Sequence, residues 1–250
     1  MLTPPRLRSA FRFALFPVLL AACAGTHPRD AGGNGREFAG RALAVWMPEA
    51  SAASLSGPAD LAAGLRAAFP GAASESTGAV LARAFGDAFW PGLVPSLAHV
   101  VPVRVPDSLP AAPQDRGIRV APADGDTTGP HSVPAVPDSA WLAEHGLAAD
   151  LILALGPLSA SAASEERNAY RFGGSIRVTT LNLEGEYLLW DYPGRRPLAR
   201  GRFRSRTGYR FTPEAGDWNR LFGQAARSVA DAMPFKRPPK RRLRIFPWDS

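Results

Sequence analysis

Cysteine is the scarcest residue in this 250-residue sequence, with a single occurrence, Cys23. An internal disulfide needs two cysteines and is therefore excluded. Histidine is also scarce, and none of the four forms an HExxH motif or another paired spacing typical of a metal site. The G-x-S-x-G sequence of a nucleophile elbow is missing as well. The sequence thus gives no motif-based prediction of a metal, a cofactor or a catalytic residue.

The middle of the chain has no net positive charge, although the formal net charge of the whole sequence is +7. Three arginines lie within residues 1–12, and the tail 236–250 carries a net +5, so residues 23–235 together carry −1. A basic nucleic-acid-binding domain is disfavoured, because its charge would lie on the folded part. The hydrophobic content of 46% predicts a globular domain there.

No apolar run in the leader is long enough to span a bilayer as a helix. Residues 1–12 carry only positive charge, and the apolar run 13–22 is short and contains Pro17. Small residues then precede Cys23, and Leu20-Ala21-Ala22-Cys23 resembles the bacterial lipobox. That resemblance implies transfer of diacylglycerol to the Cys23 sulfur and removal of residues 1–22 as a signal peptide. The alternative is an ordinary signal peptide followed by an incidental cysteine.

Two further features concern the segment that follows Cys23. Residue 24 is alanine rather than the aspartate associated with retention at the inner membrane, which in a Gram-negative source favours the periplasmic side of the outer membrane. Residues 23–40 are rich in glycine and polar residues, which predicts a flexible tether. A phosphate-binding loop at 32–35 is the alternative, but its spacing is wrong and no strand precedes it.

Hydrophobic spacing predicts a single domain over 41–235. The predicted elements are a buried strand at 41–47, helices at 58–69 and 77–90, an edge strand at 99–105, a helix at 138–146 and a strand buried on both faces at 149–155. Pro91 is expected to end the second helix, and Asp138 to cap the third. Residues 106–137 are dense in proline, glycine and aspartate, which indicates a surface insertion or long loop.

A long antiparallel hairpin is predicted from strand-like segments at 176–190 and 198–211. In both segments the odd-numbered positions are mostly apolar or small and are expected to face the core, from Leu181 to Phe211. The even-numbered positions of the second segment put five arginines on the other face: Arg200, Arg202, Arg204, Arg206 and Arg210. This row is either a strip for an anionic ligand or a solvated face paired with Glu184 and Glu186.

The register of this hairpin follows from the same alternation. If odd positions face inward on both strands, the numbers of paired residues must add to an even value. A two-residue loop at 193–194 gives an odd value, so we expect an odd-length loop with a glycine-assisted bulge. A final helix is predicted with Thr212 as its cap and Pro213 in its first turn. The fold class is therefore α+β, with a mixed sheet, a long C-terminal hairpin and helices packed on it.

The order of these elements resembles a known bacterial domain family. The resemblance rests on four pieces: the apolar strand 42–48 ending in proline, the helix 77–90, the unit Leu147-Ala-Ala-Asp-Leu-Ile-Leu-Ala-Leu-Gly156, and the hairpin 186–201 with a tryptophan before its turn. They resemble the α/β domain shared by the TolB amino-terminal domain, the curli-secretion lipoprotein, the penicillin-binding-protein-activating lipoproteins and the Pel polysaccharide-export lipoprotein. The resemblance implies a non-enzymatic role in assembly or in protein interaction.

Outside known motifs, the catalytic candidates are two neighbouring carboxylates. Glu165 and Glu166 are adjacent in what is predicted to be a polar loop, and two neighbours in a loop do not define an acid/base pair. Four tryptophans fall at positions predicted to lie in the core: Trp46, Trp141, Trp190 and Trp218. The expectation is a lipid-anchored, non-catalytic envelope module that binds a protein partner or assembles with itself. The alternative is an envelope glycan or peptidoglycan hydrolase with scattered carboxylates.

The tail 236–250 combines cations with apolar residues, and Pro238-Pro239 keeps it extended. Its cations and its tryptophan are Lys236, Arg237, Lys240, Arg241, Arg242, Arg244 and Trp248. Such a mixture is suited to an anionic lipid headgroup layer. We therefore expect the tail to rest on an anionic surface, a lipid or a cell-wall polymer. The alternatives are a solubilising tail and, less favoured for a secreted chain, a nucleic-acid-binding one.

Overall fold

The computed structural model describes residues 35–47, 50–106, 117–118, 136–169 and 174–237, with side chains of 117–118, 166–169 and 174–178 excepted. Its strands are β1 (Ala42–Trp46), β2 (Ala53–Ser56), β3 (Val101–Arg104), β4 (Gly117–Ile118), β5 (Val136–Pro137), β6 (Leu151–Ala169), β7 (Gly174–Asp191) and β8 (Arg196–Tyr209). Its helices are α1 (Ala59–Ala68), α2 (Thr77–Leu93), α3 (Ser139–Glu144) and α4 (Ala215–Asp231). Short 3-10 turns are η1 (Arg36–Phe38), η2 (Ala50–Ala52) and η3 (Val94–Ser96).

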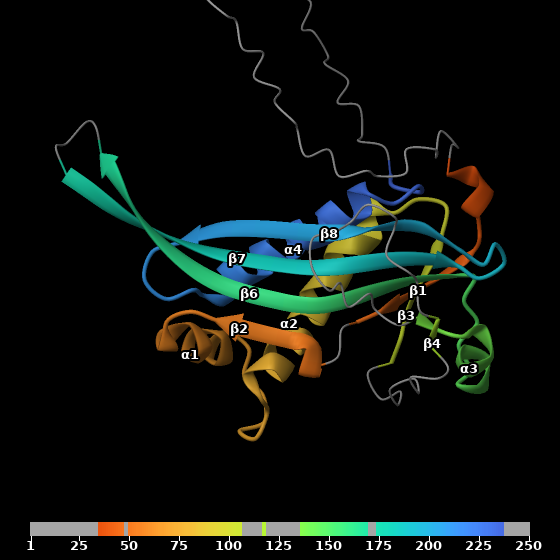
Figure 1. Ribbon diagram of the computed structural model, residues 1–250, viewed down its shortest axis with the longest axis horizontal. Coiled ribbons are helices and arrows are strands. Elements are labelled where there is room, and N and C mark those ends of the chain that lie inside the picture. Colours follow the sequence, from red (N-terminus) through yellow and green to blue (C-terminus); the bar gives the residue numbers. More distant parts are fainter. Residues whose placement is uncertain (1–34, 48–49, 107–116, 119–135, 170–173, 238–250) are drawn as a thin grey trace, which may run out of the picture.

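The main sheet mixes parallel and antiparallel strands in the order β3-β1-β6-β7-β8 (Figure 1). β3, β1 and the start of β6 are parallel, whereas β6, β7 and β8 form an antiparallel meander. β2 pairs with β6 farther along that strand than β1 does. The α+β prediction, with its mixed sheet and long C-terminal hairpin, is confirmed.

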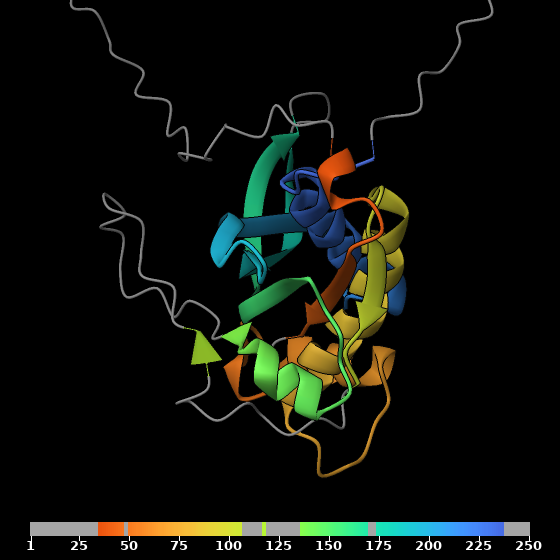
Figure 2. The ribbon, with the colours of Figure 1, turned by 90° about the vertical axis from the view of Figure 1, so that its right-hand side faces the viewer.

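Both faces of the sheet carry a hydrophobic core, but of unequal size. The larger core lies under α1, α2 and α4 and includes Phe85, Phe203 and Trp218, all almost fully buried. The smaller one lies on the opposite face, where α3 places Trp141 over Ile152 and its neighbours. Figure 2 shows α3 and the α2–α4 pair as separate groups of helices. The start of β6 lies between the two cores, which explains why it is buried on both faces as predicted.

The hairpin register and the predicted bulge are confirmed, but the odd-length loop and the role of a glycine are wrong. Leu189 pairs with Ala199 and every pair beyond it also adds to an even value. The loop has an even number of residues, since Asp191 pairs with Arg196. A bulge that leaves Leu198 unpaired then restores the inward phase of the odd positions. The left-handed residue of the turn is Arg195, with φ 48°, and not a glycine.

Three further predictions about element ends are wrong. α2 continues through Pro91 to Leu93, since proline already has a helical φ and Leu93 is fully buried. The cap of α4 is Glu214, not Thr212: its side chain and that of Asp217 form a reciprocal capping box. Glu165 and Glu166 lie within β6, because backbone pairing with β7 continues to Ala169 despite the polar composition.

Other local predictions are confirmed. β3 forms the sheet edge on the side of β1. The Asp138 carboxylate accepts a hydrogen bond from the Trp141 amide and so caps α3, which is followed by Gly146 at φ 72°. Most of the predicted insertion 106–137 lies outside the described residues; within it, β4 and β5 pair as a small antiparallel sheet.

The predicted tether 23–40 ends earlier than expected. The backbone of η1 is ordered against the domain, and Phe38 is buried at 4% exposure against the ring of Phe235. The Gly40 amide donates to the His99 carbonyl. The packed part of the chain therefore includes residues 35–40. Residues 23–34 of the predicted tether, like the signal peptide 1–22, lie outside the described residues.

Candidate functional site

The predicted arginine row lies on the sheet face that is opposite α1, α2 and α4. Arg202, Arg204 and Arg206 are exposed, and Arg200 is half-buried. In Figure 1, α2 and α4 lie behind β6, β7 and β8, and of the described elements only α3 and the β4–β5 pair approach the near face, at one end. The prediction that these arginines share one solvent-facing side is confirmed.

Glutamates of β7 stand directly opposite two of these arginines. The Arg202 Nε donates to the Glu186 Oε1 at 3.2 Å, and the Arg204 Nε lies 3.2 Å from the Glu184 Oε1. Arg206 stands opposite Asn182, which is uncharged. Exposed pairs of this kind contribute about 0–1 kcal/mol each, so they favour the register more than they raise stability. Four arginines against two glutamates leave this part of the face with a net positive charge.

Two rows of polar side chains cross the same face through four strands. The paired residues are Ser54, Ser159, Glu184 and Arg204 in the first row, and Ser56, Ser161, Asn182 and Arg206 in the second. All of them are exposed or half-buried. We call this surface the polar sheet face. Its side chains carry hydroxyl, amide, carboxylate and guanidinium groups, and the Ser54 hydroxyl already donates to the Leu158 carbonyl. Such a composition is typical of a surface for a polar or anionic partner.

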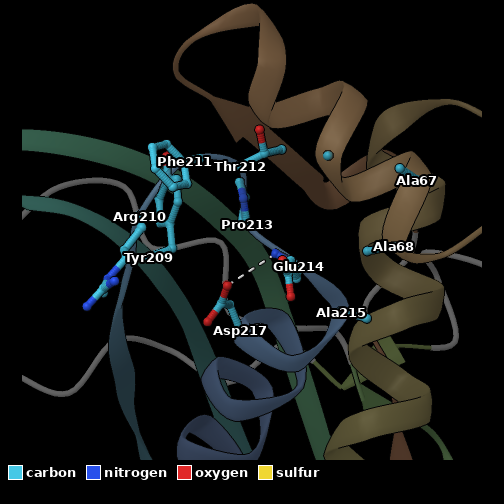
Figure 3. A pocket seen from close by; sticks show the side chains of 12 residues that line it. Ala67, Ala68, Tyr209, Arg210, Phe211, Thr212, Pro213, Glu214, Ala215 and Asp217 are labelled. Atoms are coloured by element: carbon cyan, nitrogen blue, oxygen red, sulfur yellow. Dashed lines mark hydrogen bonds between the residues drawn. The ribbon is translucent and has the colours of Figure 1, made fainter.

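A second surface feature lies where β8 leads into α4, next to α1. It is a hollow of 740 Å³ lined by the end of α1, by residues 208–215 and by Asp217. Figure 3 shows Tyr209 and Phe211 on one side of it and Ala67 and Ala68 on the other. Phe211 is 89% exposed, contrary to its predicted inward orientation, because β8 ends at Tyr209 and the alternation stops there. We call this hollow the corner pocket.

The two carboxylates of the corner pocket are already engaged. The Asp217 Oδ2 accepts the Glu214 amide at 3.1 Å, drawn as the dashed line in Figure 3, and Glu214 accepts the Asp217 amide in return. Asp217 also lies 3.6 Å from the Arg220 guanidinium. Arg210 points away from this pair (Figure 3). Burial, together with the Asp60 carboxylate, raises the pKa of Tyr209. These carboxylates hold the start of α4 and do not form an unengaged acid/base pair.

The remaining predicted residues fall into two groups. Lys236 and Arg237 lie beyond α4, where Lys236 is 3.5 Å from Asp231 and the Arg237 amide donates to the Ser96 carbonyl. The others lie outside the described residues: Cys23, Lys240, Arg241, Arg242, Arg244 and Trp248. The predicted core tryptophans are buried or half-buried. The serine partners of the polar rows and the corner pocket were not predicted, since both depend on contacts between distant segments.

Within the described ranges, no three histidine, cysteine, aspartate or glutamate side chains are grouped closely enough to hold a metal ion. None of the helices in that same part of the chain is both long and apolar enough to cross a membrane. His145 stacks on Trp141 with ring centroids 4.0 Å apart and lies close to the carbonyl of that residue, so its surroundings are those of a packed side chain.

Comparisons with known proteins gave distant structural neighbours only. No protein-family model and no curated protein sequence matches this chain. A Helicobacter pylori structure, described as that of a homologue of a neuraminyllactose-binding hemagglutinin, has a TM-score of 0.33 at 9% identity and covers 78% of this chain and 83% of its own. The hypothetical protein CT253 of Chlamydia trachomatis has a TM-score of 0.34 at 12% identity, covering 78% and 98%. Scores this low support no inference about function.

Proposed function

We propose that this protein is a lipid-anchored, non-catalytic lipoprotein of the bacterial envelope whose domain serves as an interaction or assembly module. The observation that carries the proposal is Cys23, the single cysteine, placed directly after Leu20-Ala21-Ala22 at the end of a short apolar run. Acylation of that thiol would hold the domain at a membrane, and in a Gram-negative source Ala24 favours the outer membrane. The family resemblance of the sequence supports the same role.

The polar sheet face is the surface that we assign to the partner. Arg202, Arg204 and Arg206 are exposed, the arginines outnumber the glutamates opposite them, and Arg206 has an uncharged neighbour across the ladder. A partner with carboxylate or phosphate groups would therefore meet guanidinium donors already aligned on a rigid strand. An acidic surface of an envelope protein or an anionic cell-wall polymer fits this chemistry.

The alternative function, an envelope glycan or peptidoglycan hydrolase, has its best location in the corner pocket. Its two carboxylates are engaged in the capping box of α4, which does not favour acid/base chemistry. Turnover of purified peptidoglycan by the protein, abolished by Glu214→Gln or Asp217→Asn while the unfolding midpoint stays within a few degrees, would establish the hydrolase instead.

Lipidation is tested by the intact mass of full-length protein extracted from the membranes of an expressing bacterium. We expect a chain that begins at Cys23 and carries acyl groups, and we expect Cys23→Ser to release the protein from the membrane fraction. An unmodified chain cut at another position would contradict the proposal.

The role of the polar sheet face is tested by binding to peptidoglycan sacculi that carry their anionic polymers. Arg204→Gln with Arg206→Gln should lower the affinity and flatten its salt dependence. The matched control is Arg66→Gln with Arg220→Gln, which removes two exposed arginines from the helical side. Equal losses in both double variants would show that binding follows total charge and not this face.

A further inference from the structure

The two ends of the described chain meet at one end of the domain. The rings of Phe38 and Phe235 pack edge to face with centroids 5.5 Å apart. A Cβ on Gly35 would lie only 3.1 Å from the Pro234 carbonyl oxygen, so η1 and the segment after α4 are in direct contact. The Ala98 amide donates to the Phe235 carbonyl at 2.9 Å, which ties both to the loop before β3. We call this region the junction end.

The junction end lies far from the corner pocket and from the part of β6 and β7 that extends beyond β8. α4 runs from the corner pocket at Glu214 to the junction end at Asp231, a rise of about 25 Å for a helix of this length. β6 and β7 pair with each other beyond the point where β8 ends, at the pair Thr179–Tyr209, and form a two-stranded arm. Figure 1 shows this arm at one end of the long axis and η1 at the other.

Both parts of the sequence assigned to a membrane continue from the junction end. Twelve residue steps separate Gly35 from Cys23. A chain of that length reaches at most about 40 Å when fully extended and averages about 20 Å as a flexible coil. The basic tail continues directly from Arg237. Because the average reach is shorter than α4, an anchor at Cys23 favours the orientation in which the junction end is the part of the domain nearest the bilayer.

The surface chemistry of the junction end matches a headgroup layer. Arg36, Lys236 and Arg237 are exposed there beside the exposed carboxylates of Glu37 and Asp231, so these five residues carry a net charge of +1. Val101 is the first residue of β3, and its side chain is 54% exposed. Among the described residues, only Val101 and Phe211 are large apolar side chains with such exposure. Cations beside a small apolar contact suit the interface of an anionic bilayer.

We infer that the junction end is the membrane-facing surface of the domain, seated on anionic lipid, so that the corner pocket and the arm point away from the bilayer. This inference rests on the proposed function, because it takes a membrane to be the site of anchoring. It adds the orientation and names the folded residues that touch the lipid. The polar sheet face, which runs along the side of the molecule, then stays accessible to a partner in the periplasm.

The test measures amide hydrogen exchange of residues 23–250 coupled through the Cys23 thiol to a maleimide lipid in vesicles. Chemical coupling supplies the anchor whether or not the cell acylates Cys23, so failure of the inference is distinguishable from failure of the lipidation proposal. With phosphatidylglycerol in the vesicles, exchange should slow in 35–41 and 97–104 and remain unchanged in 206–215. Purely phosphatidylcholine vesicles should give little of this protection, and added salt should remove it.

Charge-reversal variants assign the contact to named residues. Arg36→Glu with Arg237→Glu should abolish the protection, whereas Arg66→Glu with Arg220→Glu, on the helical side, should leave it intact. Protection centred on 180–186 and 200–206 would overturn the inference by placing the polar sheet face on the lipid. Protection that disappears on deletion of 238–250 but survives Arg36→Glu with Arg237→Glu would overturn it too, since the tail alone would then make the contact.

Discussion

At the scale of single residues, two glycines of the hairpin are explained by the aromatic rings that face them. Gly185 pairs with Phe203 and Gly201 pairs with Tyr187 across the β7–β8 ladder. A Cβ on Gly185 would lie 2.4 Å from the Phe203 ring, and one on Gly201 would lie 2.8 Å from the Tyr187 hydroxyl. Each ring thus covers the backbone of the glycine opposite it, which compensates for the side chain that glycine lacks.

Gly185→Ala is therefore expected to destabilise the domain by about 1–3 kcal/mol, because Phe203 must move within a packed core. The matched control is Gly208→Ala in β8, where the nearest atom to a new Cβ is 3.9 Å away. We expect that change to lie within about 0.5 kcal/mol of the parent. Urea unfolding of the two variants measures the difference, and equal midpoints would contradict the steric explanation.

Tyr192 gives a prediction for alkaline pH. Its hydroxyl donates to the Pro137 carbonyl, and burial, assisted by the Asp138 carboxylate, raises its pKa strongly. An unfolded tyrosine ionises near pH 10, so above that pH the unfolded state loses a proton that the folded state keeps, and stability falls by up to about 1.4 kcal/mol per pH unit.

Tyr192→Phe should accordingly cost about 1 kcal/mol at pH 8, from the lost hydrogen bond. The gap to the parent should shrink or reverse by pH 11, because phenylalanine does not ionise. Denaturant unfolding at both pH values measures it. A gap that is the same at pH 8 and pH 11 would mean that Tyr192 ionises equally in both states.

At the scale of elements, the start of α4 shows how a cap is selected by geometry. Thr212, Glu214 and Asp217 all precede or open the helix, and threonine has the higher intrinsic preference for the capping position. Pro213 is buried beside α1, where a Cβ on Gly64 would lie 3.4 Å from the Pro213 carbonyl oxygen. That contact fixes the chain so that Glu214, and not Thr212, reaches the first amides of the helix.

Glu214→Ala should therefore destabilise the domain by about 0.5–2 kcal/mol, the usual loss for a cap. Thr212→Ala should change the free energy of unfolding by no more than about 0.5 kcal/mol, since its side chain is exposed. The free energies of unfolding in urea compare the two. A larger loss for Thr212→Ala would restore threonine as the cap.

At the scale of the whole molecule, residues before the first strand belong to the folded domain. Phe38 lies in the larger core although it precedes β1, and Arg41 lies over its ring at 5.4 Å while pairing with Asp191 at the end of β7. The junction end is thus held by segments from both ends of the chain and from the hairpin. Loss of Phe38 should loosen all of them together.

Phe38→Ala in the full-length chain is expected to cost about 3–5 kcal/mol, as for other buried phenylalanines. Phe211→Ala is the matched control, because the same side chain is removed from an exposed site, and it should cost no more than about 0.5 kcal/mol. Thermal unfolding ranks the two variants. Similar midpoints would mean that η1 does not contribute to the stability of the domain.

The sequence by itself determined the features that depend on neighbouring residues. Alternation with period two is a local property, so it correctly placed Arg200 to Arg206 on one face and Leu181, Leu183 and Leu189 on the other. Apolar spacing likewise located α1, α2 and α4, and the chemistry of Asp138 identified a true cap. The lipobox resemblance at Cys23 is of the same local kind.

Only the tertiary structure decided what depends on segments that are distant in the sequence. The serines that complete the polar rows come from β2 and β6, and no local pattern relates Ser54 to Arg204. Strand pairing extended β6 through Glu165, packing against α1 selected Glu214 as a cap, and the contact with Phe235 made Phe38 part of the core. In each case the stabilising free energy comes from contacts between segments that the folded chain brings together, and it outweighs the local conformational preference. Because those contacts join distant residues, the neighbouring sequence carries no signal of them.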